Sequence, residues 1–420
     1  MKKLALLFML TALLACKKDP PQPFNFTIHS LDDPEIKIIS LSIALSDADG
    51  RVVYLEERAV PDDPKGISEL FPLKFIADQE QSADQRFDIT CVYRMNQPPF
   101  DRAYTWLDVA SGATLGYLEP LSTNTGFQAN AIRNALELQI TNAPTNTVAE
   151  IVNGDFGQKF QQITPTLALL SGEGYTSGKG FLTAFYSPGS AEPRIHWLPW
   201  TDQNYLVART IPFGQTTADY PKAQINMPHP GLWFSEVSAV FNKDRAGTWM
   251  FVRRPGARVD VGTEIKFPDL PEISAPFYRL QASDTSMYVD YLFEKGKYQL
   301  PGEYLQPINF QIGLFSAQPL ISAESSGAGD MLSVRLIEPI SEHVWTIIGP
   351  PERFKNYRLI SFPQAFLNRS FHAYRPEGPV QVDAYSFENY GEYNDLWANT
   401  DFSEFFWRAK ARMIRVTKTY

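Results

Sequence analysis

Apolar and polar residues alternate with a period of two along much of the chain, a pattern typical of half-buried β-strands. In residues 39–45, Ile39, Leu41, Ile43 and Leu45 alternate with serine and alanine. Similar alternation recurs in segments 51–56, 87–95, 136–141, 332–336 and 380–384. Because antiparallel sheets commonly bury one face and solvate the other, we predict antiparallel strands at these positions.

The sequence Asp47-Ala48-Asp49-Gly50 separates the first two of these segments. An Asp-Gly pair supplies the positive φ angle that tight hairpin turns require, so we predict a β-hairpin here. The aspartates also match the start of an EF-hand calcium loop, but the third acidic position and the distal glutamate are absent. A turn is therefore the preferred interpretation.

Helical periodicity is scarce, and its best case lies near the end of the chain. Asp401 and Glu404 suit a capping box, and the aromatic spacing over residues 402–409 fits one face of a helix. A competing alternation over residues 407–413 indicates a strand. We predict a short helical turn to about Phe406, followed by a closing strand to Tyr420.

These patterns predict an all-β protein with two or three antiparallel β-sandwich (Ig-like) domains in tandem. The chain of 420 residues exceeds a typical single domain, and its 32 prolines favour many short elements. Turn-rich residues 142–146 and the proline-rich segment 267–272 mark the expected boundaries. The expected domains are residues 24–142, 143–270 and 271–420.

The first fifteen residues have the layout of a signal peptide. Lys2 and Lys3 precede an apolar run over residues 4–15, and Cys16 follows at once. The run is too short to cross a bilayer as a mature helix. We therefore predict a signal peptide at residues 1–15.

Leu13-Leu14-Ala15-Cys16 resembles the lipobox of bacterial lipoproteins, which reads roughly leucine, two small residues and cysteine. Leu14 departs from the small residue usual at its position. The resemblance implies that a signal peptidase cuts before Cys16, that a diacylglycerol is attached to the sulfur, and that the new amino terminus is acylated, as with palmitate. Two or more acyl chains anchor a protein stably to a membrane.

Residues 16–23 carry the lipidated cysteine and three prolines, which favour an extended tether. By resemblance to Gram-negative lipoproteins, Lys17 lacks the acidic signal for inner-membrane retention. The expected location is therefore the outer membrane, on either its periplasmic or its surface face. In organisation alone, the chain resembles the multidomain lipoproteins that assist nutrient uptake in Bacteroidota.

The net charge narrows the expected classes of binding partner, and the cysteine content bears on disulfide formation. The chain has 38 basic and 47 acidic residues; removal of residues 1–15, with Lys2 and Lys3, leaves 36 basic residues and a net charge of −11. Such an acidic body argues against nucleic-acid binding, which needs clustered cations. With Cys16 lipidated, Cys91 has no intramolecular disulfide partner, and its strand pattern predicts a core position.

The motifs for cofactors, metals and catalysis are incomplete. In the glycine-rich segment 172–180, Glu173 and Gly180 stand where a Walker loop needs glycine and serine or threonine. The sequence has no Gly-x-Ser-x-Gly elbow, and no two of its five histidines have zinc-ligand spacing. Local sequence therefore predicts no cofactor, no metal and no catalytic residue.

Two aromatic clusters supply the candidate ligand-binding residues. Trp197, Trp200, Asp202 and Tyr205 form the first cluster. Flat apolar rings beside a carboxylate are the usual surface for stacking a sugar, which predicts glycan binding. The alternative is that the rings pack at the ends of sandwiches, because aromatic residues are common core material.

Tyr390, Tyr393 and Trp397 form the second cluster, in a stretch that also contains acidic residues. Its chemistry suits a sugar, calcium or a protein partner, with core packing again the alternative. Glu388 and Glu392 raise the further hypothesis of a glycan hydrolase, which requires two carboxylates at a set separation in a cleft.

The leading hypothesis is a lipid-anchored, non-enzymatic envelope protein that binds a ligand such as a glycan, or another envelope protein. The alternatives are a glycan-directed hydrolase with dispersed carboxylates, and a structural or assembly lipoprotein. Rings that line an open groove would favour binding, and facing carboxylates there would favour the hydrolase. Buried rings would favour the assembly protein.

Overall fold

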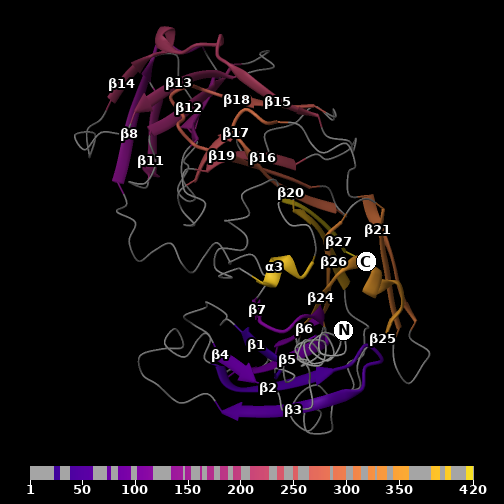
Figure 1. The fold of residues 1–420 in the computed structure, drawn as a ribbon. Coiled ribbons are helices and arrows are strands. Elements are labelled where there is room, and N and C mark those ends of the chain that lie inside the picture. Colours follow the sequence, from indigo (N-terminus) through magenta and orange to yellow (C-terminus); the bar gives the residue numbers. More distant parts are fainter. Residues whose placement is uncertain are drawn as a thin grey trace, which may run out of the picture.

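In a computed structural model, the described residues fold into β-sheets with very little helix (Figure 1). The structure describes residues 23–28, 38–59, 73–76, 84–95, 102–116, 134–144, 147–152, 161–162, 168–174, 180–187, 193–199, 209–226, 234–240, 249–253, 264–283, 287–298, 306–313, 320–326, 329–337, 344–358, 380–387, 393–398 and 413–419.

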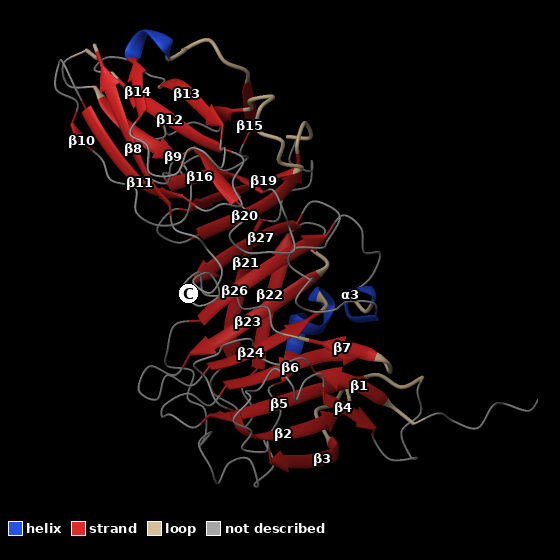
Figure 2. Ribbon diagram, turned by 90° about the vertical axis from the view of Figure 1, so that its left-hand side faces the viewer, coloured by secondary structure: helices blue, strands red, loops and turns tan. Residues whose placement is uncertain are grey.

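A sheet of twelve strands runs through the described part of the molecule and joins its lower and upper parts (Figure 2). Its neighbouring strands are antiparallel, except that β24 and β6 are parallel. From one outer strand to the other, this long sheet consists of β17 (Trp249–Arg253), β16 (Phe234–Val240), β19 (Phe277–Ser283), β20 (Met287–Glu294), β27 (Met413–Thr419), β26 (Val380–Phe387), β23 (Met331–Ile337), β24 (Val344–Gly349), β6 (Arg102–Val109), β5 (Phe87–Met95), β2 (Ile38–Ser46) and β3 (Val52–Ala59).

Smaller sheets accompany the long sheet. Their strands, in spatial order, are β4 (Leu73–Ile76), β1 (Asn25–Ile28) and β7 (Ala113–Leu115); β21 (Gln306–Gly313), β22 (Leu320–Ser326) and β25 (Tyr357–Arg358); β15 (Lys222–Asn226) and β18 (Glu264–Pro268); β10 (Gln161–Gln162), β9 (Val148–Val152), β12 (Gly180–Tyr186) and β13 (Arg194–Pro199); and β11 (Ala168–Gly174), β8 (Asn134–Thr141) and β14 (Arg209–Pro212). The described helical turns are η3 (Phe213–Gln215), η4 (Pro351–Asn356) and α3 (Asp395–Ala398).

The long sheet has a hydrophobic core on each face. Successive side chains of a strand point to opposite faces. On β6, Tyr104 and Trp106 belong to one cluster of buried residues, whereas Ala103 and Leu107 belong to another. We call the cluster with Tyr104 and Trp106 core A and the cluster with Ala103 and Leu107 core B.

Different elements cover the two faces. Core A includes Phe26 of β1, Phe75 of β4 and Trp397 of α3, so these elements lie over one face of the long sheet. Core B includes Phe267 of β18 and Phe354 of η4, so the opposite face is covered further along the sheet. The result is a set of face-to-face sheets that share one long layer.

The parallel pairing of β6 with β24 joins the amino-terminal strands of the long sheet to its carboxy-terminal strands, and we call it the β6–β24 seam. On the core B face, the Trp345 indole nitrogen donates a hydrogen bond to Thr105 Oγ1 at 2.9 Å. The Thr105 and Thr90 hydroxyls are also 2.9 Å apart. The Trp345–Thr105 hydrogen bond fixes the register between segments that are 240 residues apart in sequence, and Thr90 connects Thr105 to the neighbouring strand β5.

The predicted hairpin is confirmed. Asp47 Oδ1 accepts hydrogen bonds from the Asp49 and Arg51 amides at 3.1 and 2.8 Å, and Gly50 has φ of 81°. The Asp47 side chain thus holds the turn backbone between β2 and β3 in place. Gly50 supplies the left-handed conformation that this tight turn requires.

The predicted all-β class with antiparallel sheets is also confirmed, and the six alternating segments lie in strands, except that Arg51 precedes the first residue of β3. Cys91 is a buried free cysteine, as predicted. The expectation of a half-buried strand is wrong for β5, where every side chain from Phe87 to Cys91 is buried, and the neighbouring β6, which the alternation did not mark, is likewise buried from Ala103 to Leu107. The reason is that cores A and B cover both faces there.

The long sheet takes strands from each expected domain: residues 24–142, 143–270 and 271–420 all contribute. The boundaries themselves stay predictions. Near the second one, Tyr278 and Tyr298 donate hydrogen bonds to the Asp269 carboxylate at 3.2 and 2.6 Å. Lys295 Nζ donates to the carbonyls of Leu270 and Ile273, so this turn is tied to β19 and β20.

The closing strand is confirmed as β27, whereas the helical turn expected at residues 401–406 lies outside the described residues. Among the described helices, none has both the length and the apolar content needed to cross a membrane.

Gly349→Ala tests the close packing of the seam. A Cβ atom at Gly349 would lie 2.8 Å from the Leu107 Cβ, well inside van der Waals contact, and neither backbone can easily move. We expect a loss of about 1–3 kcal/mol in the free energy of unfolding, measured by urea denaturation. Gly214→Ala is the control, because no atom lies within 4 Å there, and its effect should stay within about 0.5 kcal/mol. An unchanged stability for Gly349→Ala would contradict this packing.

Candidate functional site

The first aromatic cluster is only partly described. Trp197 lies on β13, paired with Leu182 of β12, and its half-buried ring packs against core B. Trp200, Asp202 and Tyr205 lie outside the described residues. The predicted sugar-stacking surface at this cluster therefore stays a prediction.

In the second cluster, Tyr393 and Trp397 are buried in core A, where their rings form an edge-to-face pair with centroids 5.8 Å apart. The Tyr393 hydroxyl donates a hydrogen bond to the Ile348 carbonyl at 3.3 Å, and burial raises the pKa of Tyr393. Both rings are used in packing and present no open face for a sugar. Tyr390, like the predicted lipid site Cys16, lies outside the described residues.

Trp397→Ala tests whether this second cluster is packing material. Because the indole is fully buried, we expect a loss of about 3–5 kcal/mol in the free energy of unfolding, measured by chemical denaturation. Trp197→Ala is the matched comparison: its ring is half-buried, so its loss should be roughly half as large or smaller. Equal losses of stability in the two variants would contradict the difference in burial between Trp397 and Trp197.

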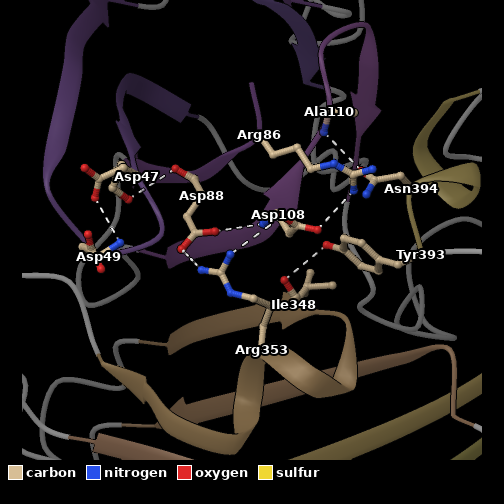
Figure 3. Close-up of polar contacts among 11 residues, drawn as sticks. Asp47, Asp49, Arg86, Asp88, Asp108, Ala110, Ile348, Arg353, Tyr393 and Asn394 are labelled. Carbon is tan, nitrogen blue, oxygen red and sulfur yellow. Dashed lines mark hydrogen bonds and ion pairs between the residues drawn. The ribbon is translucent and has the colours of Figure 1, made fainter. Parts of the chain in front are cut away.

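Sequence reasoning missed a buried charged network at one end of the β6–β24 seam, drawn in Figure 3. Asp88 of β5 is only 2% exposed, and its Oδ2 accepts a hydrogen bond from Arg353 Nη2 of η4 at 2.8 Å. The other oxygen of Asp88 accepts the backbone N–H of Asp108 at 2.9 Å. Both carboxylate oxygens are therefore occupied by donors from different elements.

A β-bulge creates this arrangement. The register between β5 and β6 shifts opposite Asp88, and Asp108 adopts the left-handed φ of 57°. A non-glycine residue in that region stores on the order of 1 kcal/mol of strain. The Asp108 carboxylate lies 3.1 Å from Arg86 Nη1 and 3.8 Å from Arg353 Nη1. Arg353 therefore contacts both aspartates, whereas Arg86 contacts Asp108.

Neighbouring segments also form hydrogen bonds around this network. Asn394 Oδ1, just before α3, accepts the backbone N–H of Ala110 at 3.1 Å. Ser46 Oγ, at the end of β2, donates to the Asp88 carbonyl at 3.4 Å. Strands β2, β5 and β6 thus meet η4 and the start of α3 around one buried carboxylate.

The electrostatics of Asp88 reflect opposing effects. Burial raises the pKa of Asp88 to about 6, although the charge of Arg353 and the Asp108 amide act to lower it. Tyr357, directly after η4, is also buried, and burial together with the Asp88 charge raises its pKa. A carboxylate with such a pKa has the proton affinity of a general base. The Asp88 side chain is 2% exposed and each of its oxygens already accepts a hydrogen bond from another element, so its evident action is to join structural elements.

A titration of stability tests this site. The folded pKa of about 6 lies above the value of about 3.9 for a free aspartate, so the native state binds the proton more tightly. The contribution of Asp88 to stability is thus fully present below about pH 4 and is lost as pH rises through about 6.

We compare the free energies of unfolding of the wild type and Asp88→Asn at several pH values. Their difference, wild type minus variant, should fall between pH 4 and 7 by on the order of 2 kcal/mol. A difference that grows over this range would mean that Arg353 outweighs the burial of the carboxylate.

No protein-family model matches the chain, and no curated protein matches it. Among solved structures, it is similar to two B repeat units of the collagen-binding protein of Staphylococcus aureus, with 8% sequence identity. The match covers 78% of this chain and 100% of that one, with a TM-score of 0.12. At this TM-score the two structures do not superpose as whole folds, so the similarity carries no argument about function.

Proposed function

We propose that the chain is a lipid-anchored protein of the bacterial outer membrane whose β-sheet body binds or scaffolds another envelope protein, rather than catalysing a reaction. The single observation that carries the scaffold role is the long sheet, which has a packed core on each face. Such a body holds its two ends at a fixed separation. That property suits a protein which links a membrane to a partner.

The lipid anchor is supported by residues at the start of the chain. The lipobox-like Leu13-Leu14-Ala15-Cys16 ends the apolar segment, and the fully buried Phe24 follows only eight positions after Cys16. The folded body therefore begins almost at once after a short proline-rich tether.

The fate of the aromatic residues supports a scaffold over a sugar-binding site. The Tyr393 and Trp397 rings are buried in core A, and the Trp197 ring packs against core B. Glycan binding at Trp200, Asp202 and Tyr205 remains the prediction made from sequence. Glu388 and Glu392, the carboxylates of the hydrolase hypothesis, lie outside the described residues, so that hypothesis also stays a prediction.

Cys16→Ser tests the anchor. In a Gram-negative host, the wild-type chain should lose residues 1–15, gain the mass of a diacylglycerol and acyl chain, and sediment with membranes. The serine variant has no sulfur to modify, so it should lack lipid and leave the membrane fraction. Intact-mass spectrometry and membrane fractionation measure both outcomes. An unmodified wild-type cysteine, or equal membrane retention of the variant, would contradict the proposal.

A further inference from the structure

We propose that the body stands on the lipid surface by the β3 end of the long sheet and the neighbouring strand β4 of the small sheet that covers it, with the β15–β18 end pointing away from the membrane. This orientation rests on the proposed lipid anchor. The partner of the β3–β4 end is the bilayer surface itself, and three observations support it.

The first observation is the reach of the tether. Eight residues separate Cys16 from Phe24, which is fully buried in core A. A fully extended chain spans at most about 3.6 Å per residue, so Phe24 lies within about 29 Å of the anchored sulfur. A polyproline conformation shortens this reach to about 25 Å.

The second observation is the place of β1 on the long sheet. β1 follows Phe24 directly, and its Phe26 shares core A with Leu41 of β2 and Ile89 of β5. These strands lie at the β3 end of the sheet, as both ribbon views show (Figures 1 and 2). Twelve strands have eleven intervals of about 4.8 Å, so the outer strands lie about 53 Å apart as measured along the sheet, roughly twice the reach of the tether.

The third observation is the distribution of exposed apolar side chains. Among the described residues, the large exposed hydrophobic side chains are Val53 and Leu55 of β3, with 39% and 43% exposure, and Ile76 of β4, with 67%. All three lie at the tethered end, and exposed Lys74 accompanies Ile76 on β4. Ile76 beside Lys74 on β4 suits the interface between lipid headgroups and acyl chains, and Leu55 on β3 adds apolar surface next to the exposed Glu57.

The net negative charge of the folded body disfavours the alternative orientation, in which the long face lies flat on the membrane. The mature chain has a net charge of −11, because 36 basic residues remain beside 47 acidic ones once Lys2 and Lys3 are removed with residues 1–15. Close approach of the whole long face to anionic lipid would therefore be repulsive. Contact through one small end avoids most of this repulsion while keeping the apolar residues of β3 and β4 near the lipid.

Single-cysteine labelling tests the orientation in the full lipidated chain. The Cys16 sulfur is bound to lipid under the proposed function, and the Cys91 thiol is fully buried, so a new surface cysteine reacts selectively. Ile76→Cys and Leu55→Cys report on the tethered end. Gln224→Cys, on the exposed side of β15, is the matched control at the far end. All three sites are exposed, so the fold should persist.

Each variant carries an environment-sensitive fluorophore and is reconstituted into phosphatidylcholine–phosphatidylglycerol vesicles containing a lipid with a spin-labelled headgroup. We expect quenching at positions 76 and 55 to be at least about twofold stronger than at position 224, given the length of the sheet. Equal quenching at all three positions, or stronger quenching at 224, would overturn the orientation.

Two further readouts separate the alternatives. Quenching at position 76 that follows protein density instead of quencher lipid would show that a second copy of the chain covers this end, which also overturns the inference. Flotation of the vesicles tests the anchor separately: the labelled chain should float, and its Cys16→Ser form should not. Failure to float would remove the anchor and the orientation together, whereas flotation with the wrong quenching pattern would remove the orientation alone.

Discussion

The β6–β24 seam is the constraint on which the rest of the described structure depends. Strands β3, β2, β5 and β6 come from the first part of the chain, and only the parallel pairing of β6 with β24 continues the long sheet from them. Loop-closure entropy opposes such a distant pairing, because it must be overcome before any contact forms. Buried contacts on both faces of the seam offset that cost.

Those contacts differ in kind along the seam. Trp345 and Thr105 form a hydrogen bond within core B, and Gly349 allows Leu107 to pack against the backbone of β24. At the end of the seam, Arg353 contacts Asp88 across 265 residues of sequence. A buried ion pair adds little net stability once desolvation is counted, but it penalises any register that leaves one charge alone. We therefore interpret the Asp88 network as the feature that selects the correct strand register at the β6–β24 seam.

A rigid seam has a consequence for the proposed function. It makes the amino-terminal strands and the distal strands one continuous sheet, so under the proposed function the position of the lipid anchor would determine where the far end lies. Separate sandwiches joined by flexible linkers would lose that relation, because linker motion would average it. The buried rings of Tyr393 and Trp397 serve the same end, since they fasten α3 to core A beside the seam.

The sequence by itself determined the β class, the strands marked by clear alternation and the Asp47–Gly50 hairpin, because period-two alternation and turn chemistry act over a few neighbouring residues. It also predicted the burial of Cys91. It did not reveal that β5 and β6 are buried on both faces, or that Asp88 is a core residue, since Asp88 occupies a polar position in an alternating strand. Aromatic residues were equally ambiguous: the same rings suit a sugar site or a core, and only packing decided for Tyr393 and Trp397. The tertiary structure alone decided these points, because burial and charge pairing depend on partners hundreds of residues away, which no local pattern encodes.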